Sequence, residues 1–322
     1  MRFHILGTGA IGCHIATELR RRNPVTLLLR SQNHVQEFLD RKNRITYLRL
    51  HQQPVEITGF DALNFHDPPE DCTVDALVVA TKAQHAVEAI RTVKPMLNRD
   101  STLVLFQNGM GVAEELLSKV WESAKDAPSI VVGVNRHAVE RLAPYSIKHN
   151  SGWNDPQALA LGAMPHSQKD KIKAVIDAFT ECPDMRTTVL EWPELRKRMM
   201  RKLVINATIN PLAGVLDVNN GRILESPEAM ELLRGLTEEV AKTLTELECT
   251  NDELFDEVVK MAEIAAANNC STVQDLRAKR KSEIEFINGY IVRLAKERGI
   301  SVPLNETFLR LIHSKEHAIG AQ

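Results

Sequence analysis

Three polar side chains recur every four residues in an otherwise apolar segment, and they are the residues of this sequence best placed to do chemistry. They are Lys202, Asn206 and Asn210 in the run KLVINATIN. On a helix this spacing puts all three on one face, where burial is costly unless each polar group has a partner. A partly desolvated lysine loses proton affinity and approaches the range of a general acid near neutral pH. The alternative is an amphipathic helix whose lysine extends to water and whose asparagines cap neighbouring elements.

Two more polar residues follow in the C-terminal part of the chain. Ser271 begins the run STVQ, which matches a helix-capping box, and Glu283 lies about three turns along a helix expected over 272–299. We expect Ser271 to be the N-cap of that helix, where its hydroxyl can also receive a substrate carboxylate. Glu283 is either part of a site or a surface partner of Lys279, and the sequence leaves both open.

The N-terminus carries a glycine-rich loop between an apolar strand and a helix. The loop residues are Gly7, Thr8, Gly9, Ala10, Ile11 and Gly12. A strand over 3–6, a helix over 10–22 and a strand over 25–29 complete a βαβ unit. In such a unit the glycines allow a tight turn, a close approach of pyrophosphate and close helix packing, while the helix N-terminus attracts phosphate. The pattern predicts a bound dinucleotide.

Arg30 ends the second predicted strand and bears on which dinucleotide binds. NAD-binding versions of the unit usually place Asp or Glu there to hold the ribose hydroxyls. Here Arg30 is followed by uncharged polar residues, and a guanidinium suits a 2′-phosphate. We therefore expect NADPH as the cofactor, the alternative being a solvated arginine at a strand end.

Two other predicted strands end in polar residues. Lys82 follows the strand over 74–81, and Asn108 lies in the QNGMG turn after the strand over 101–106. Ligands of a doubly wound sheet bind at the carboxyl ends of its strands. Lys82 can therefore face the cofactor, and Asn108 a nicotinamide ribose or a substrate group. The plainer alternatives are a solvated lysine and an ordinary Asn-Gly turn.

The elements that position these residues change character along the chain. Further strands are expected at 130–134, 146–148, 158–164 and 187–190, and further helices at 83–97, 111–123 and 168–180. Long segments of helical period follow, at 191–210, 227–248, 251–268 and 272–299. Alternating strands and helices indicate a parallel sheet. The prediction is a Rossmann-type doubly wound α/β domain over 1–187 and an all-α domain over 188–322, with the catalytic cleft between them.

Composition limits the class of protein. The chain has 322 residues, 43% of them hydrophobic, which is enough for two domains. With 40 basic and 42 acidic residues its net charge is −2, which argues against nucleic-acid and membrane partners. The five cysteines and 11 histidines show no metal-ligand spacing, so we expect no metal and no disulfide framework. Without a signal sequence or a long apolar run, the expectation is a cytoplasmic monomer or homodimer acting on a small molecule.

Taken together, these segments resemble the ketopantoate reductases. The resemblance rests on GTGAIG, TKAQ, QNGMG, KLVINATINPLAG and STVQDLRAKRKSEIEFINGY, in that order and spacing. It covers residues 1–312 and implies reduction of the ketone of 2-dehydropantoate to (R)-pantoate with NADPH, a step towards pantothenate and coenzyme A.

The resemblance also implies roles for single residues. Lys202 resembles the catalytic lysine that donates a proton to the ketone oxygen, and Glu283 the glutamate that binds the substrate hydroxyl. The other implied site residues are Asn206 and Asn210 at the substrate, Ser271 at its carboxylate, Asn108 beside the nicotinamide, and Lys82 and Arg30 at the cofactor.

Two segments, 134–152 and 212–226, depart from the family pattern. They keep open a reductase of another branched 2-oxo acid. A third alternative is a sensor module that binds NADP(H) without turnover, although such a module has no need of a proton donor in an apolar stripe.

Overall fold

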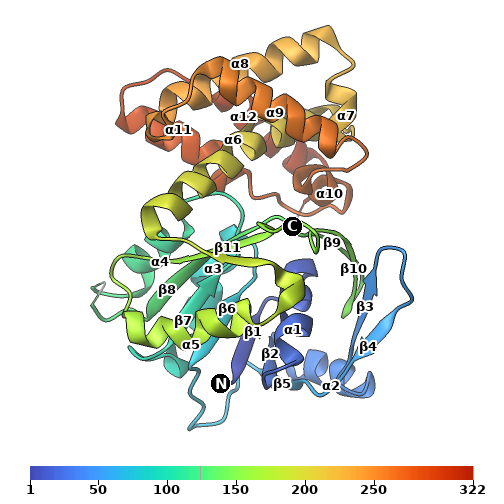
Figure 1. Ribbon diagram of the computed structural model, residues 1–322, viewed down its shortest axis with the longest axis vertical. Helices are drawn as coiled ribbons and strands as arrows, with labels where there is room; N and C mark the ends of the chain where they lie inside the picture. The colour runs from blue at the N-terminus through green and yellow to red at the C-terminus, as the bar shows by residue number, and fades with distance from the viewer. Residues whose placement is uncertain (124, 322) are drawn as a thin grey trace. The chain divides into compact units, whose positions relative to one another are not determined.

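The structure is a computed structural model that describes residues 1–123 and 125–321 (Figure 1). The chain forms two compact units: Met1–Gln107 with Val112–Leu195, and Asn108–Gly111 with Arg196–Gln322. The division falls within helix α6 (Trp192–Leu216) and not at residue 187, because strand β12 (Thr187–Val189) still pairs with the sheet of the first unit.

The first unit is built on an eight-stranded sheet of order β12-β11-β8-β7-β6-β1-β2-β5. Its remaining strands are β1 (Phe3–Leu6), β2 (Val25–Leu29), β5 (Asp61–Asn64), β6 (Ala76–Val79), β7 (Thr102–Leu105), β8 (Ser129–Asn135) and β11 (Leu159–Ala163). Neighbouring strands pair in parallel along the part of the sheet that runs β5-β2-β1-β6-β7-β8. Strand β11 is antiparallel to β8. The chain order reverses between β1 and β6, which is where doubly wound sheets bind ligands. The predicted Rossmann-type fold is confirmed.

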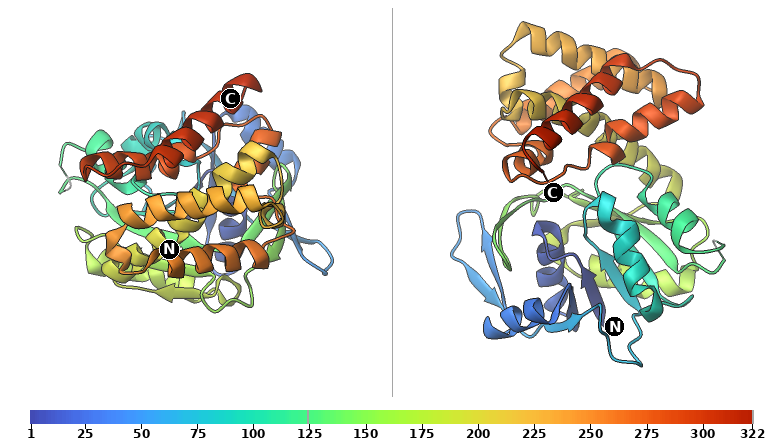
Figure 2. Two further views of the ribbon diagram at one scale, coloured as in Figure 1. Left: turned by 90° about the horizontal axis from the view of Figure 1, so that it is seen from above. Right: turned by 180° about the vertical axis from the view of Figure 1, so that it is seen from behind.

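Helices cover both faces of this sheet (Figures 1 and 2). They are α1 (Ala10–Arg20), α2 (Gln32–Asp40), α3 (Ala83–Val93), α4 (Val112–Val120) and α5 (Lys169–Thr180). α1 and α5 share one apolar core with Phe3 and Ile5 of β1. α3 and α4 contact each other on the opposite face, which is turned forward in the right-hand view of Figure 2. The α/β alternation predicted from the sequence thus becomes a three-layer unit.

A second, smaller sheet encloses α1. It has the order β4-β3-β10-β9, with β3 (Ile45–Arg49), β4 (Val55–Ile57), β9 (Ala138–Ala143) and β10 (Ser146–Ser151). β3, β9 and β10 contact α1, so every residue from Gly12 to Leu19 is buried. The sequence predicted only the start of β10, because β4 and β9 are largely exposed and lack the apolar run that marks a buried strand.

The second unit is helical, as predicted. Besides α6 it contains α7 (Asn220–Ile223), α8 (Pro227–Thr243), α9 (Asn251–Ile264), α10 (Ser271–Arg277), α11 (Asn288–Glu297) and α12 (Pro303–Ala318). The single helix predicted over 272–299 is wrong. The chain leaves α10 through Lys279, whose φ of 52° is left-handed, makes a 3₁₀ turn at Ile284–Phe286 (η4), and only then enters α11.

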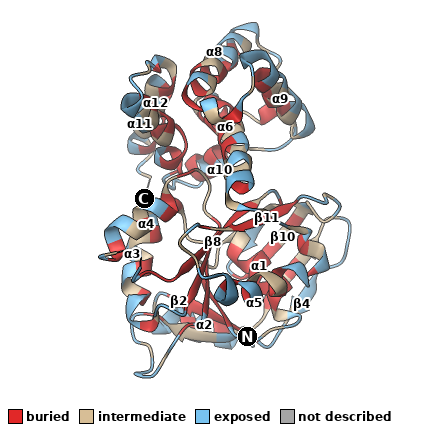
Figure 3. Ribbon diagram, turned by 60° about the vertical axis from the view of Figure 1, so that its left-hand side comes forward, coloured by how far each residue is buried: buried red, intermediate tan, exposed pale blue. Residues whose placement is uncertain are grey.

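Apolar side chains of α6, α8, α9 and α11 form the core of this unit. Figure 3 shows these buried residues along the inward faces of the helices. None of the described helices combines the length and the apolar run that a bilayer span requires.

The buried histidine of strand β1 provides a test of the first unit's core. His4 is 5% exposed, and burial, with a smaller contribution from Arg2, lowers its pKa from 6.5 to about 4. Between these values the unfolded chain binds a proton that the folded chain does not, so the folded state loses stability as the pH falls. We expect His4→Leu to reduce the loss in unfolding free energy between pH 7 and pH 5 by roughly 2 kcal/mol, measured by urea unfolding.

The matched control is His66→Leu, which removes an exposed histidine from the same unit. An unchanged pH dependence in His4→Leu, or an equal change in both variants, would contradict the prediction.

Candidate active site

Lys202, Asn108 and Glu283 form a hydrogen-bonded relay in the second unit. Lys202 Nζ donates to Asn108 Oδ1 over 2.8 Å, and Asn108 Nδ2 donates to Glu283 Oε2 over 2.9 Å. This amide orientation suits both partners, because an ammonium group only donates and a carboxylate only accepts. The contacts place the amino group of Lys202 and the carboxyl group of Glu283 on either side of one neutral amide.

The turn that carries Asn108 is fixed by a single carbonyl group. A Cβ at Gly109 would overlap the Phe286 carbonyl oxygen, and Gly109 has a φ of +83°. The next residue, Met110, donates its backbone N–H to the same oxygen over 2.9 Å. Phe286 ends η4, which begins directly after Glu283. The Asn-Gly pair is therefore a close contact with the segment of Glu283 and not an ordinary surface turn.

Glu283 lies between α10 and η4, not three turns along a helix as predicted. Its side chain is 9% exposed. The preceding residue, Ser282, anchors the segment, because its N–H and its Oγ each donate to Glu316 Oε1 over 2.7 Å. Glu316 belongs to α12, a helix for which the sequence analysis gave no prediction. Glu316 is thus a positioning residue that sequence reasoning missed.

The other end of the polar stripe on α6 meets Ser271. Asn210 is 4% exposed, and its Nδ2 donates to Ser271 Oγ over 3.4 Å. Asn206, one turn before Asn210, is half-buried. The predicted capping box is wrong: Cys270 is the N-cap, it makes no side-chain capping bond within the described chain, and Ser271 is an exposed first residue of the seven-residue helix α10.

A buried polar chain holds α6 in the middle of its stripe. Pro211 lies inside α6 and has no N–H, so the Ala207 carbonyl lacks its helical donor. Asn288 Nδ2 supplies that hydrogen bond over 2.8 Å and also donates to Asn305 Oδ1 over 2.9 Å. Asn305 in turn donates from its N–H and its Nδ2 to Glu239 Oε2, over 2.8 Å each. Three other helices therefore fix the backbone that carries the lysine and the asparagines.

The glycine loop lies at the end of β1 in the first unit. Gly7 has a φ of +104°, and a Cβ there would lie 2.5 Å from Thr81 N. A Cβ at Gly12 would overlap the Gly7 carbonyl oxygen, whereas one at Gly9 would meet no heavy atom of the described residues within 4 Å. Gly9 is also the N-cap of α1 without a described side-chain capping bond. The loop thus fits a dinucleotide: open space and helix N–H groups occur where pyrophosphate is expected.

Further residues at the same sheet edge fit a nucleotide. Arg30 follows β2, is exposed, and forms no hydrogen bond or ion pair with a described residue. Lys82 opens α3 and is half-buried. Gln107, which sequence reasoning missed, ties two strand ends together by donating from Nε2 to Val79 O over 2.9 Å and to Thr81 O over 3.2 Å.

The predicted site residues therefore fall into two groups. The second unit brings together Lys202, Asn108, Glu283, Asn206, Asn210 and Ser271, and the first unit carries the glycine loop, Arg30 and Lys82. Each group is local to its own unit. The catalytic cleft between the two domains stays a prediction.

A glycine loop at the switch point of a doubly wound sheet, in a chain that also carries a lysine-centred polar relay, is typical of dinucleotide-dependent oxidoreductases. The chain belongs to the ketopantoate reductase family: the family model described as ketopantoate reductase PanE/ApbA matches residues 3–166, and the model of its C-terminal part matches residues 194–316.

Similar proteins support this assignment along nearly the whole chain. A probable 2-dehydropantoate 2-reductase of Schizosaccharomyces pombe is 30% identical over 345 residues, which cover 97% of this chain and 95% of that protein. The 2-dehydropantoate 2-reductase of Saccharomyces cerevisiae is 27% identical, with 91% and 87% covered. The fold is similar to that of D-mandelate dehydrogenase with NADH and anilino(oxo)acetate, at a TM-score of 0.84, 20% identity and 100% coverage of both chains.

Two alanine substitutions in the glycine loop distinguish a glycine that is needed for packing from one that leaves space for a ligand. Gly12→Ala is expected to lower the free energy of unfolding by roughly 1–3 kcal/mol, because its Cβ has no room. Gly9→Ala is expected to leave that free energy unchanged or raise it by up to about 1 kcal/mol, because the φ of Gly9 is −76° and the space is open. Urea unfolding of the two variants checks both values.

Isothermal titration with NADPH completes this test. Gly9→Ala is expected to weaken nucleotide binding in a fully folded protein. Unimpaired binding by Gly9→Ala would show that the open space is not where the pyrophosphate lies.

Proposed function

We propose that this protein reduces 2-dehydropantoate to (R)-pantoate with NADPH and that Lys202 is the general acid. The observation that carries the proposal is the relay from Lys202 through Asn108 to Glu283. The relatives from S. pombe and S. cerevisiae, both named for this reaction, support the choice of substrate.

Reduction of a ketone needs a hydride at carbon and a proton at oxygen. NADPH, when bound, supplies the hydride. Negative charge then develops on the ketone oxygen, where an ammonium group both stabilises the charge and gives up the proton. Asn108 holds one N–H of Lys202 and so fixes the direction of Nζ. The products are pantoate, NADP⁺ and a neutral lysine that regains its proton from solvent.

Glu283 acts on both the substrate and the lysine. Its carboxylate accepts the hydroxyl of the substrate as a hydrogen-bond donor and holds the ketone in line with Nζ. Through its hydrogen bond from Asn108 Nδ2, Glu283 also holds the amide in the orientation that lets Oδ1 accept from Lys202 Nζ.

The far end of the stripe binds the substrate carboxylate. Ser271 Oγ and Asn210 Nδ2 lie 3.4 Å apart and both can donate hydrogen bonds to an anion. Asn206 lies between Asn210 and Lys202 on the same helix face, in position to contact the middle of the substrate. Anchoring at two points fixes the ketone relative to the proton donor, which is a large part of the rate advantage of a bound substrate.

The decisive experiment follows NADPH oxidation at the absorbance of the reduced nicotinamide, with 2-dehydropantoate as the substrate. Lys202→Ala is expected to lower kcat by about 10²–10⁴-fold while the Kd for NADPH stays the same, because only the proton transfer is lost. Lys197→Ala is the matched control on the same helix, since Lys197 is exposed and its Nζ lies 3.3 Å from Glu248 Oε2. It is expected to retain wild-type kcat.

The outcomes separate the alternatives. A wild-type protein that turns over another branched 2-oxo acid in preference to 2-dehydropantoate would keep the chemistry and change the substrate. NADPH binding with no turnover of any 2-oxo acid, unaffected by Lys202→Ala, would establish a binding module instead.

Cofactor choice is tested at Arg30. Loss of a charge-assisted hydrogen bond to the 2′-phosphate costs about 1.5–3 kcal/mol, so Arg30→Ala is expected to raise KM for NADPH by roughly 10–100-fold and to leave KM for NADH nearly unchanged. Arg22→Ala, another exposed arginine of the first unit, is the control. Equal loss with both cofactors would place Arg30 away from the 2′-phosphate.

A ketopantoate reductase from Staphylococcus aureus, of similar fold at a TM-score of 0.74 and 18% identity, is described as dimeric. For this chain, a monomer or a homodimer binding a small 2-oxo acid is the proposal.

A further inference from the structure

Three buried histidines of the first unit lie against one another, apart from every residue used above. They are His14 on α1, His137 in the turn between β8 and β9, and His149 on β10, with 1%, 6% and 0% of their surfaces exposed. One ring nitrogen from each lies within 4.8 Å of the other two. The sequence spacing predicted no metal site, but these ligands come from three separate elements that only the fold brings together.

We propose that His14, His137 and His149 bind one divalent transition-metal ion, with zinc as the preferred ion. The reduction of a 2-oxo acid does not use this site, and no residue of the Lys202 relay belongs to it. The ion would be structural, joining α1 to the small sheet.

His14 is the residue that points to a ligand. Both of its ring nitrogens are buried, and neither has a hydrogen-bond partner among the described residues. A neutral imidazole keeps one N–H donor and one lone pair, and leaving both unsatisfied in a core costs free energy. Its ring centroid lies 4.4 Å from that of His149 and 4.9 Å from that of His137. A metal ion among the three rings would use the lone pair of His14.

The outer nitrogens of the other two rings already have the partners that metal-bound histidines usually have. His137 Nε2 lies 2.9 Å from the Met185 carbonyl oxygen, so Nε2 carries the proton and Nδ1 the lone pair. His149 Nδ1 lies 2.6 Å from the Tyr47 hydroxyl, which can accept a hydrogen bond from Nδ1–H as well as donate one to Nδ1. Such outer partners fix the ring orientation and raise the basicity of the ligand atom.

The inner nitrogens have nearly the spacing of a tetrahedral site. Zinc–nitrogen bonds of about 2.0–2.1 Å put two ligand atoms about 3.3 Å apart. His137 Nδ1 and His149 Nε2 are 3.0 Å apart and share a hydrogen bond that a bound ion would replace, and all three ligand atoms lie within 4.8 Å of one another. Small side-chain rotations would bring all three to one ion. An all-imidazole set favours zinc, copper or nickel over magnesium or calcium.

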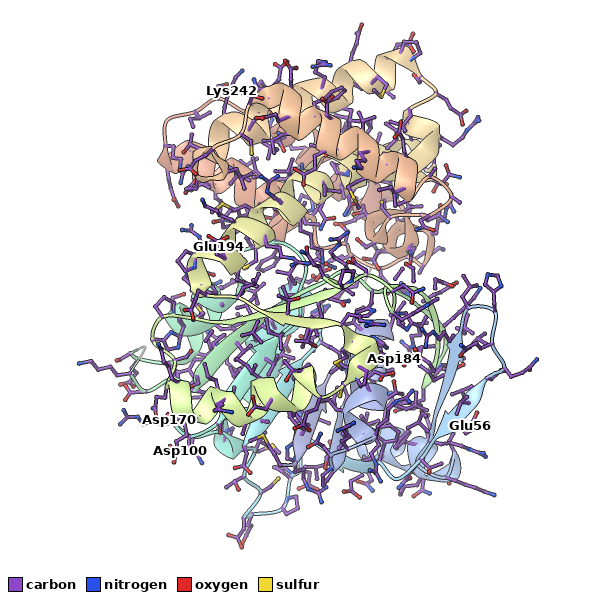
Figure 4. All side chains as sticks on the ribbon, in the orientation of Figure 1. Glu56, Asp100, Asp170, Asp184, Glu194 and Lys242 are labelled. Atoms are coloured by element: carbon purple, nitrogen blue, oxygen red, sulfur yellow. The ribbon has the colours of Figure 1, made fainter. Side chains whose placement is uncertain are left out.

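Acidic groups near the cluster can offset the charge of the ion. Glu18 follows His14 by one turn of α1 and is 1% exposed, and its Oε1 is buried without a hydrogen-bond partner among the described residues. Its Oε2 pairs with Arg21 Nε at 3.3 Å. Asp184, labelled in Figure 4, precedes Met185 and pairs with Arg49 at 3.5 Å. The described group of mutually close ligand atoms contains the three imidazoles alone, so Glu18 would balance charge from outside the set of ligands.

The test uses the full-length wild-type protein. It is unfolded, stripped with a chelator, and refolded with Co²⁺ or Zn²⁺ alone. We expect one metal ion per chain by elemental analysis, the visible absorption of tetrahedral Co²⁺, and a thermal unfolding midpoint several degrees higher with Zn²⁺ than with the chelator. His14→Leu is expected to lose the ion and the Co²⁺ bands, and His66→Leu, which removes an exposed histidine, is expected to keep both.

Three results would overturn the proposal. One is wild-type protein that refolds without retaining either metal and without a shift of its unfolding midpoint. Another is near-ultraviolet thiolate-to-cobalt absorption, which would assign the ion to cysteines. The last is folded His14→Leu that still holds stoichiometric metal. If His14→Leu does not fold, the Co²⁺ spectrum and the metal content of the wild-type protein decide the question alone.

Discussion

The amide of Asn108 is the interaction on which the helical unit depends. Its oxygen accepts from the amino group of Lys202 while its nitrogen donates to the carboxyl group of Glu283, and the amide itself does not titrate. To reach both partners, residues 108–111 leave the sheet that precedes them and pack with the second unit. The close contact of Gly109 with the Phe286 carbonyl makes that possible, since any larger residue would push the turn off η4. The turn that carries Asn108 thus connects Lys202 with Glu283.

Rigidity of α6 is the second requirement of the same site. A proline inside a helix usually costs a hydrogen bond and some order. Here the freed carbonyl of Ala207 is used as an acceptor for Asn288, and through Asn305 and Glu239 it connects α6 to α11, α12 and α8. The apparent defect in the helix is therefore where the other helices attach. Lys202 and the asparagines project from a backbone that these helices hold.

The sequence predicted elements whose signals are local and missed those set by long-range contacts. β1 and β2 have the predicted bounds, because short apolar runs beside a glycine loop admit few other structures. The broken helix after α10 was not predicted, because nothing in a lysine marks the left-handed conformation of Lys279. Residue types at the site were visible in the stripe and the NGMG turn. The residues that hold the backbone beside them, Glu316 and Asn288, could not be recognised, because no spacing rule connects residues on different helices.

Helix α1 lies between two sheets, so its buried polar side chains cannot reach water. A helix covered on one side sends its polar residues to water, but His14 and Glu18 have no such side. Their N–H groups, lone pairs and charge must be satisfied inside the protein or paid for in stability. His137 and His149 solve this by a directed chain of hydrogen bonds ending at the Met185 carbonyl and the Tyr47 hydroxyl. That chain leaves both ring nitrogens of His14 without a partner among the described residues, and a cation held by the three imidazoles would use the lone pair of one of them.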